Sequence, residues 1–238
     1  MIYVPFVADD DFREVVASVL VPVVENTQNI DIYKNTIDPF AAVFDAMLQH
    51  ITLDAWLKQE HARQRQKTLQ NKIGDFHQRL IGKLSDCQSL ETGHIIDVHC
   101  ASKQVIAEIK NKYNTTKGNH KKQIYDDLAA ALELAQYQDH VGYYVAIIPK
   151  NKQRYNKVFT PPDNLTHQTR QENERIRHID GYSFYALLTD IPDALQQVYE
   201  ALPKVIGDVL ELPPPVTQHI VTDDHISNLF ARAYHTDE

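Results

Sequence analysis

Two opposite charges stand in a short apolar stretch near the middle of this chain. Residues 105–109 are apolar except for Glu108, and Lys110 follows directly. Side chains alternate along a strand, so Glu108 and Lys110 project side by side from the face that also carries Ile106. Desolvating an ion without a partner costs several kcal/mol, so a strand containing both charges needs partners for them. The pattern therefore predicts a strand whose two charged side chains have partners or a function.

A third charge, Asp97, ends the short apolar run that precedes this strand. Mg²⁺ prefers hard oxygen ligands and is held by one or two carboxylates, with waters and substrate phosphate completing its shell. Asp97 and Glu108 offer such a pair, and Lys110 would then face the attacking water. The alternative is a surface hairpin with a Glu–Lys ion pair, which is common and contributes little stability. Both interpretations predict a hairpin.

The elements around these charges follow the order strand, strand, helix, strand. Residues 121–138 repeat apolar side chains at helical spacing, and residues 141–149 are β-branched and aromatic and end at a proline. A helix in this position makes the crossover between two parallel strands. Elsewhere the patterns predict helices at 12–24, 40–58, 71–84, 193–210 and 223–234, a strand at 174–185, and a rigid break at 213–215.

The net charge of −8 is unusual for a nucleic-acid-binding protein, but its distribution is uneven. Residues 101–180 contain 13 Lys and Arg against 9 Asp and Glu, whereas the rest of the chain contains 11 against 23. The positive charge therefore follows the charged hairpin. Without a signal-peptide pattern or a membrane-spanning run, we expect a cytoplasmic protein. Cys87 and Cys100 form no CxxC motif, so we expect both to be reduced.

The helix expected at 71–84 leads directly into the hairpin and carries three polar residues of interest. Asp75, His77 and Gln78 are candidates for additional active-site groups. For His77 the alternative is a structural histidine with satisfied hydrogen bonds. The helix at 40–58 and the helix at 193–210 are the apolar elements outside the core, and we expect them to form an interface between copies.

Several longer segments occur around the hairpin in a fixed order, namely NKIGDFHQRLIG, IIDV, IAEIKNKYNTTKG, YYVAIIPK and IDGYSFYALLT. The Asp97 and Glu-x-Lys pattern resembles the PD-(D/E)xK nuclease core. Together the segments resemble the bacterial type II restriction endonucleases that cut GGNCC-type sites, over residues 38–202. One departure is Ile96, which replaces the proline often found before the first acidic residue of the motif.

The resemblance implies an α/β fold with a restriction-endonuclease-like core, in which helices flank a mixed central sheet. It implies one such domain over residues 1–238, with helical N- and C-terminal elaborations. It also implies a Mg²⁺-dependent homodimer, with Mn²⁺ substituting, that cuts both strands of a short palindromic DNA site and leaves 5′-phosphates. A companion DNA methyltransferase would protect the host genetically. By motif position, Asp97 and Glu108 would be metal ligands and Lys110 the catalytic lysine.

Basic residues near the hairpin are the candidates for contacts with double-stranded DNA. Arginine can recognise guanine because its planar guanidinium donates two parallel hydrogen bonds to the base. For each arginine the alternative is a structural salt bridge within the protein. The candidates are Lys112, Lys121, Lys122, Lys150, Lys152, Arg154, Arg175 and Arg177. Two other functions share these features: a structure-selective repair or recombination nuclease, and a non-catalytic DNA-binding module. Digestion of one long plasmid would separate the three.

Overall fold

The computed structural model describes residues 2–28, 33, 36–90, 95–116, 118–163 and 168–234. Its contacts divide the chain into two compact units. The larger contains Met1–Val16 and Phe76–Glu238, and the smaller contains Ala17–Asp75. A single domain over residues 1–238 stays a prediction.

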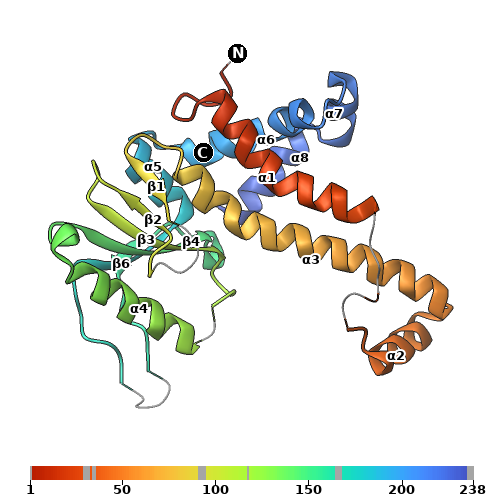
Figure 1. Ribbon diagram of the computed structural model, residues 1–238, viewed down its shortest axis with the longest axis horizontal. Coiled ribbons are helices and arrows are strands. Elements are labelled where there is room, and N and C mark those ends of the chain that lie inside the picture. Colours follow the sequence, from red (N-terminus) through yellow and green to blue (C-terminus); the bar gives the residue numbers. More distant parts are fainter. Residues whose placement is uncertain are drawn as a thin grey trace. The chain divides into compact units, whose positions relative to one another are not determined.

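The larger unit is built on a mixed sheet (Figure 1). Within the described residues the sheet has six strands in the order β1-β2-β3-β4-β6-β5. The strands are β1 (Cys87–Ser89), β2 (Val98–Cys100), β3 (Val105–Lys112), β4 (Val141–Ile148), β5 (Asn156–Val158) and β6 (Ile176–Asp180). The pairs β3–β4 and β4–β6 are parallel, and the other neighbours are antiparallel.

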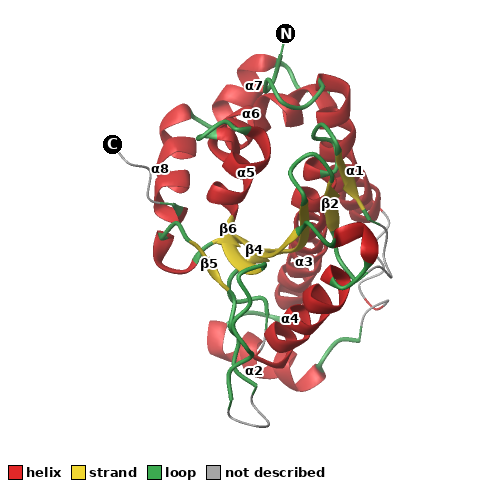
Figure 2. Ribbon diagram, turned by 90° about the vertical axis from the view of Figure 1, so that its left-hand side faces the viewer, coloured by secondary structure: helices red, strands yellow, loops and turns green. Residues whose placement is uncertain are grey.

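The core order confirms the sequence prediction. Strands β2 and β3 form the hairpin, α4 (Gly118–Leu132) makes the crossover, and β4 returns parallel to β3. Ile106, Tyr144 and Ile176 on one sheet face pack against α4. The other face packs against α5 (Gly181–Thr189), where Tyr143 contacts Phe184. Figure 2 shows the strands with α4 on one side and α5 on the other. The α/β fold class with helices flanking a mixed sheet is confirmed.

The remaining elements are helical. They are α1 (Asp9–Gln28), α2 (Pro39–Gln49), α3 (Leu53–Ile81), α6 (Ala194–Val209), α7 (Pro214–Ile220) and α8 (Asp223–Ala233), with short 3₁₀ turns at Ala135–Tyr137 and Lys150–Lys152. Three aspartates occupy the first turn of α1, where negative charge favours the positive end of the helix. No helix among the described residues is both long and apolar enough to cross a membrane.

The strand predicted at 174–185 is wrong in its second half. Strand β6 ends at Asp180, and α5 begins at Gly181. The Asp180 carboxylate accepts hydrogen bonds from Ser183 N at 3.0 Å and Tyr155 N at 2.7 Å, so it caps the helix and fixes the chain leading into β5. The alternation that predicted a strand continues into a helix that is buried on most sides, and period alone does not separate the two.

Two other boundaries differ from the prediction. The helix expected at 40–58 is interrupted at His50, whose left-handed backbone (φ 55°) ends α2. The chain then continues into α3, which includes the polar stretch 61–67 and most of the helix expected at 71–84. The prolines at 213–215 were expected to break the chain rigidly, but Pro214 and Pro215 begin α7, because proline fits the first helical turn.

The two cysteines are joined, which corrects the expectation that both are reduced. Cys87 on β1 pairs with Cys100 on β2, and their sulfur atoms lie 2.03 Å apart. The spacing in the sequence gives no CxxC motif, and only the hairpin register brings the two side chains together. The disulfide links the first two strands of the sheet.

Gly181 is a test of the packing between α5 and the sheet. A Cβ atom at this position would lie 2.6 Å from both the Cα and the carbonyl oxygen of Ile147. We expect Gly181→Ala to lower the free energy of unfolding by about 1 to 3 kcal/mol, because backbone cannot move aside as a side chain does. Urea titration followed by circular dichroism measures the change.

The matched control is Gly74→Ala on α3, where a Cβ would meet nothing within 4 Å. Alanine favours helix over glycine, so this variant should be at least as stable as the wild type. Equal urea midpoints for Gly181→Ala and the wild type would contradict the close approach of α5 to β4.

Candidate active site

The hairpin register places Asp97 close to Glu108. Asp97 directly precedes β2, whose first residue, Val98, pairs with Ala107, the neighbour of Glu108 on β3. Asp97 is half-buried, and hydrogen bonds hold both its backbone and its carboxylate. Its backbone N–H donates to Ala107 O at 2.9 Å, and its Oδ2 accepts from Ile109 N at 2.7 Å. These hydrogen bonds orient the carboxylate beside β3.

Glu108 and Lys110 project side by side, as the alternation predicted. Lys110 Nζ donates to Glu108 Oε1 at 2.6 Å. Their side chains are 34% and 19% exposed for the lysine and the glutamate, so the pair is largely removed from water yet reachable from the surface. Hence the ion pair predicted by the structural interpretation is present, on the same residues that the catalytic interpretation uses.

The carboxylates influence each other's protonation. Burial and then the negative charge of Asp97 raise the pKa of Glu108 to about 6, although Lys110 acts in the opposite direction. Burial by itself would lower the pKa of Lys110, but the hydrogen bond and charge of Glu108, together with Asp97, outweigh it and raise that pKa. Above about pH 6 the Glu108 carboxylate is therefore ionised beside the Lys110 ammonium group.

Gln78, on the last turns of α3, reaches the hairpin. Its Nε2 donates to Leu90 O at 3.0 Å and to Asp97 O at 3.2 Å. The amide therefore holds the backbone of Asp97 rather than the carboxylate. The structure brings this candidate to the site as a group that positions Asp97.

The other two candidates from this helix lie elsewhere. His77 Nδ1 is 3.0 Å from Tyr185 OH on α5, and its ring packs edge-on against Tyr185 and Phe76. Burial lowers the pKa of His77 to about 4, so the ring is neutral at pH 7. These contacts favour the structural interpretation. Asp75 is exposed and belongs to the smaller unit.

A row of side chains that sequence reasoning missed continues across the sheet from Glu108. The strand register aligns Glu108 with Tyr144, His178 and Lys157 on β4, β6 and β5. The Tyr144 and His178 rings stack with centroids 4.6 Å apart, and Tyr144 OH donates to Thr116 Oγ1 at 3.1 Å. No spacing in the sequence reveals this row, because it depends on the register between strands distant along the chain.

Burial lowers the pKa of His178 to about 3, with smaller contributions from the positive charges of Lys121 and Lys157. His178 is therefore neutral at pH 7 and accepts a hydrogen bond from Tyr155 OH over 3.0 Å. The row is neutral at its centre, where Tyr144 is fully buried, and it ends at Lys157 on the edge strand β5. Lys121 was among the sequence candidates, whereas Lys157 was not.

Arg175 and Arg177 lie just before and on β6. Arg177 aligns with Tyr143 rather than Tyr144, so it projects from the opposite face of the sheet, whereas Arg175 lies in the turn that precedes the strand. The Arg175 guanidinium donates to His140 O at 3.0 Å and Tyr137 O at 2.8 Å. That of Arg177 donates to Asn156 Oδ1 and Asn156 O, and it pairs with Glu174. The structure does not bring these arginines to Glu108, and their contacts match the structural alternative.

The other basic candidates are spread over several elements. Lys112 is exposed at the end of β3, on the face of Glu108 and Lys110. Lys122 lies 3.7 Å from both Asp126 and Asp163. Lys150 is exposed. Lys152 Nζ donates a hydrogen bond to Ala231 O at 3.3 Å. The Arg154 guanidinium lies 3.8 Å from the centroid of the Tyr182 ring. Contacts of these residues with DNA stay a prediction.

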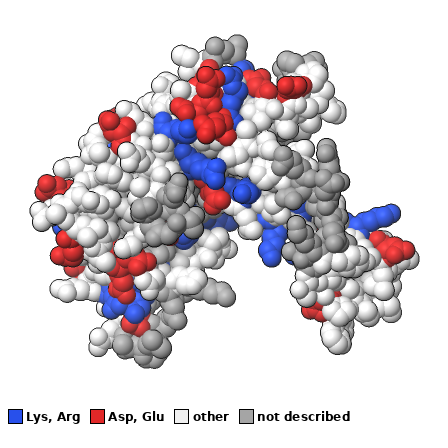
Figure 3. All heavy atoms as spheres, viewed as in Figure 1, with Lys and Arg blue, Asp and Glu red and all other residues white. Residues whose placement is uncertain are grey.

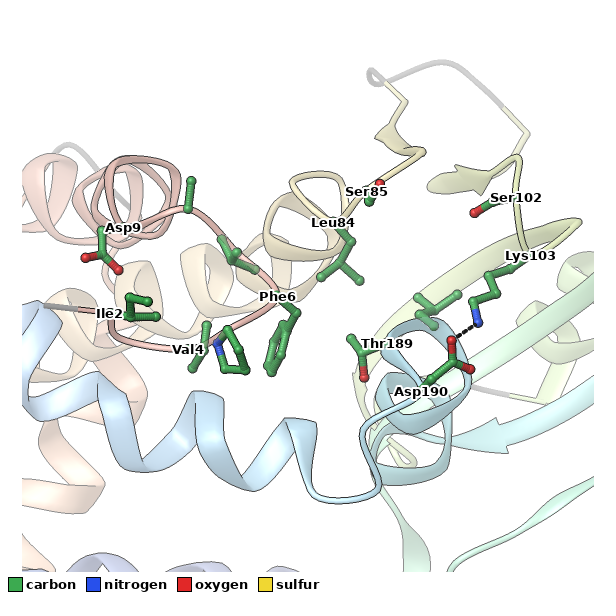
Figure 4. Close-up of a pocket in the computed structure, with 14 residues that line it drawn as sticks. Ile2, Val4, Phe6, Asp9, Leu84, Ser85, Ser102, Lys103, Thr189 and Asp190 are labelled. Atoms are coloured by element: carbon green, nitrogen blue, oxygen red, sulfur yellow. Dashed lines mark hydrogen bonds and ion pairs between the residues drawn. The ribbon is translucent and has the colours of Figure 1, made fainter.

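A hollow of about 760 Å³ lies elsewhere in the larger unit. Figure 4 shows that it is lined by the N-terminal segment around Val4, by Leu84 and by the end of α5, with Lys103 directed toward Asp190 at 2.6 Å. Asp97, Glu108 and Lys110 are not among its lining residues. The candidate site is therefore separate from this hollow.

The donor set of the candidate site fits a hard divalent cation. Within the described ranges, no group of three or more His, Cys, Asp and Glu side chains is arranged to hold a metal ion. Asp97 and Glu108 contribute a pair of carboxylates, which is the number that Mg²⁺ sites with substrate phosphate commonly use. The raised pKa of Glu108 shows that the two carboxylates lie close enough to interact. A cation between them would relieve that repulsion.

A mixed sheet flanked by helices, with two carboxylates and a lysine on its β2–β3 hairpin, is consistent with the restriction-endonuclease-like fold of nucleases. The model of the Eco47II restriction endonuclease family matches residues 4–211, and the chain belongs to this family. It is 40% identical over 181 residues to the type II restriction enzyme Eco47II of Escherichia coli, covering 74% of each chain. It is 31% identical over 215 residues to the type II restriction enzyme Sau96I of Staphylococcus aureus, covering 88% of this chain and 82% of the relative.

The comparisons decide between the functions that the sequence left open. The chain is a site-specific type II restriction endonuclease, and its partner is DNA. Restriction endonucleases generally depend on a metal ion, and the pair of carboxylates agrees with that requirement.

Proposed function

We propose that this endonuclease uses Mg²⁺ to cut both strands of a short palindromic GGNCC-type site, leaving 5′-phosphates. The observation that carries the proposal is the position of Asp97, Glu108 and Lys110, which meet on one side of the β2–β3 hairpin. The GGNCC site comes from the resemblance of the quoted segments, and the relatives support the type of enzyme. Mn²⁺ should substitute for Mg²⁺, because it also accepts carboxylate ligands.

In the proposed mechanism, Asp97 and Glu108 would hold the cation. When bound, it would supply positive charge against the scissile phosphate and would make the attacking water easier to ionise. Lys110 orients that water or stabilises the negative charge that builds up around phosphorus. Gln78 keeps the backbone of Asp97 in place through its hydrogen bond to Asp97 O. Each of these groups therefore has one task in the reaction.

Lys112 continues the face of Lys110 and is exposed, so it is well placed to contact a phosphate. The chain as a whole is negative, which limits binding to DNA outside the cognate site. We propose a cytoplasmic enzyme with a companion methyltransferase, since host DNA carries the same short sites.

Digestion of a long plasmid of known sequence tests the function. With Mg²⁺ we expect discrete fragments, all of whose ends map to GGNCC-type sites and accept ligation directly through their 5′-phosphates. The control is the same DNA methylated at those sites, which should stay intact. Cutting only at branches or mismatches would favour a repair nuclease, and uncut DNA that shifts in a gel would favour a binding module.

A further inference from the structure

Helix α2 in the smaller unit is apolar around most of its circumference, and its larger side chains point outward. Its buried residues are Ala42 and Ala46, which pack with Trp56 of α3. Five larger apolar residues recur at helical spacing on the outer face and are between 54% and 80% exposed: Phe40, Val43, Phe44, Met47 and Leu48. In Figure 3 the surface over α2 is largely white. A helix that is apolar on all sides is normally covered on all sides.

The helix is held firmly in this orientation. The Asp38 carboxylate accepts from Phe40 N and Ala41 N, and so caps the N-terminus. Asp45 accepts from Trp56 Nε1 at 2.9 Å, which fixes α2 on α3. The outward position of the large side chains is therefore built into the packing of the unit, and the outer face needs a partner surface.

The charges around α2 indicate what that partner is. Residues 36–57 contain three aspartates and neither lysine nor arginine, and Arg63, which lines a hollow with Asp38 and Asp45, is paired with Glu60. DNA phosphates and anionic lipids both require basic residues, so neither suits this surface. An apolar patch bordered by acidic residues fits a protein partner.

The exposed apolar area of α2 suits a second copy of this chain as the partner. Aromatic side chains bury about 150 to 250 Å² each, so this patch, with two phenylalanines more than three quarters exposed, offers on the order of 600 Å² against about 800 Å² per partner in a standard interface. The remainder would come from neighbouring residues. The patch is thus large enough to be the centre of a stable dimer interface.

We propose that two copies of this chain pair through the outer faces of their α2 helices. This inference rests on the proposed function, because cutting both strands of a palindrome calls for one active site on each strand, related by a two-fold axis. The proposed interface uses α2 alone and leaves out helix 193–210, which the sequence also predicted to take part. The apolar residues Leu195, Val198 and Val205 of α6 are already buried within the larger unit.

An antiparallel arrangement makes the patch complementary to itself. With Phe44 on the two-fold axis, Phe40 packs against the partner's Leu48, and the reverse contact follows by symmetry. The positive N-terminal end of each α2 then lies beside the negative C-terminal end of the other. Asp38 likewise faces the partner's His50. The arrangement leaves no like charges opposed at the ends of the helices.

Sedimentation and light scattering at micromolar concentration, with and without cognate DNA in Ca²⁺, test the interface. We expect the wild type to have the mass of two chains. Phe44→Glu with Leu48→Glu should raise the dimer dissociation constant at least about 100-fold, because charge replaces central apolar contacts. The matched control is Leu229→Glu on α8, a leucine that is 60% exposed and should leave the mass unchanged.

A cysteine variant covers the case in which the glutamate variants do not fold. In a Cys87→Ser, Cys100→Ser background, Phe44→Cys should form covalent dimers on mild oxidation, because a residue on the axis meets its own copy. Leu229→Cys should form none. Efficient crosslinking only at the control position would overturn the interface.

The outcomes separate this inference from the proposed function. A wild type that cuts GGNCC-type sites but keeps the mass of one chain, or a dimer that survives both glutamates, overturns the α2 interface and leaves the function standing. A dimer that dissociates on substitution at Phe44 and Leu48 but cuts no DNA supports the interface and overturns the function.

Discussion

Asp97→Asn and Glu108→Gln should each reduce the rate of DNA cleavage at least about 1,000-fold, because loss of metal stabilisation amounts to several kcal/mol in the transition state. Each change removes a negative oxygen ligand while keeping the size of the side chain. The protein should remain folded, since the amide oxygen introduced at either position can still accept hydrogen bonds from its neighbours. Single-turnover cleavage of a cognate duplex measures the rate, and calorimetric titration with Mn²⁺ measures metal binding.

Lys110→Ala distinguishes the lysine from the ligands. It should abolish cleavage but keep metal binding, because the lysine contributes no ligand atom and its removal leaves the Glu108 carboxylate free of its ion pair. Glu133→Gln, an exposed position at the end of α4, is the matched control and should cut at the wild-type rate. Wild-type cutting by either acidic variant would show that the metal is held elsewhere.

Acid should destabilise the protein through His77. Burial lowers the pKa of His77 to about 4 in the folded chain, from an ordinary value of 6.5. Between these pH values the unfolded chain binds a proton that the folded chain does not, so stability falls as the pH falls through this window. The loss should reach about 3 kcal/mol, since each unit of difference between the folded and unfolded pKa contributes about 1.4 kcal/mol. Urea unfolding at a series of pH values measures it.

Glu108 acts in the opposite direction over part of the same range. Its folded pKa of about 6 lies above its ordinary value of 4.5, so protonation of Glu108 favours the folded chain as the pH falls from 6 to 4.5. The His77 effect is therefore best measured in a Glu108→Gln background. There, His77→Gln should reduce the slope of stability against pH between pH 6.5 and 4, while His178, with a folded pKa of about 3, retains its own contribution. His120→Gln, at an exposed position, should leave the slope unchanged. An unchanged slope in His77→Gln would assign the acid sensitivity to another group.

The parts of the fold that the sequence predicted are those with a strong local pattern. Strands β3 and β4 follow from apolar and β-branched runs, and α4 between them follows from helical spacing. The boundary at Asp180 was missed because the next residues are apolar enough to suit a strand or a buried helix. The pairing of Cys87 with Cys100 was missed because it depends on the β1–β2 register, which local pattern does not contain.

The same distinction holds for the candidate site. Glu108 and Lys110 lie two positions apart, so alternation alone predicted their contact. Tyr144 and Lys157 join the row only through pairing across four strands, and no local signal marks them. Arg175 and Arg177 were selected by residue type, whereas their positions just before and on β6 decide their neighbours. Residue chemistry identifies candidates, and register determines which of them meet.

The short contact between Lys110 and Glu108 has a consequence for when the enzyme becomes active. Without a cation, the ammonium group of Lys110 partly neutralises the carboxylate of Glu108. In the proposed mechanism, a metal ion held by Glu108 would have to compete with that internal counterion, whereas a phosphate would attract Lys110 away from it. Metal and DNA should therefore each tighten the binding of the other, as thermodynamic linkage requires of coupled ligands. Such reciprocity would keep the proposed site inactive until both are present.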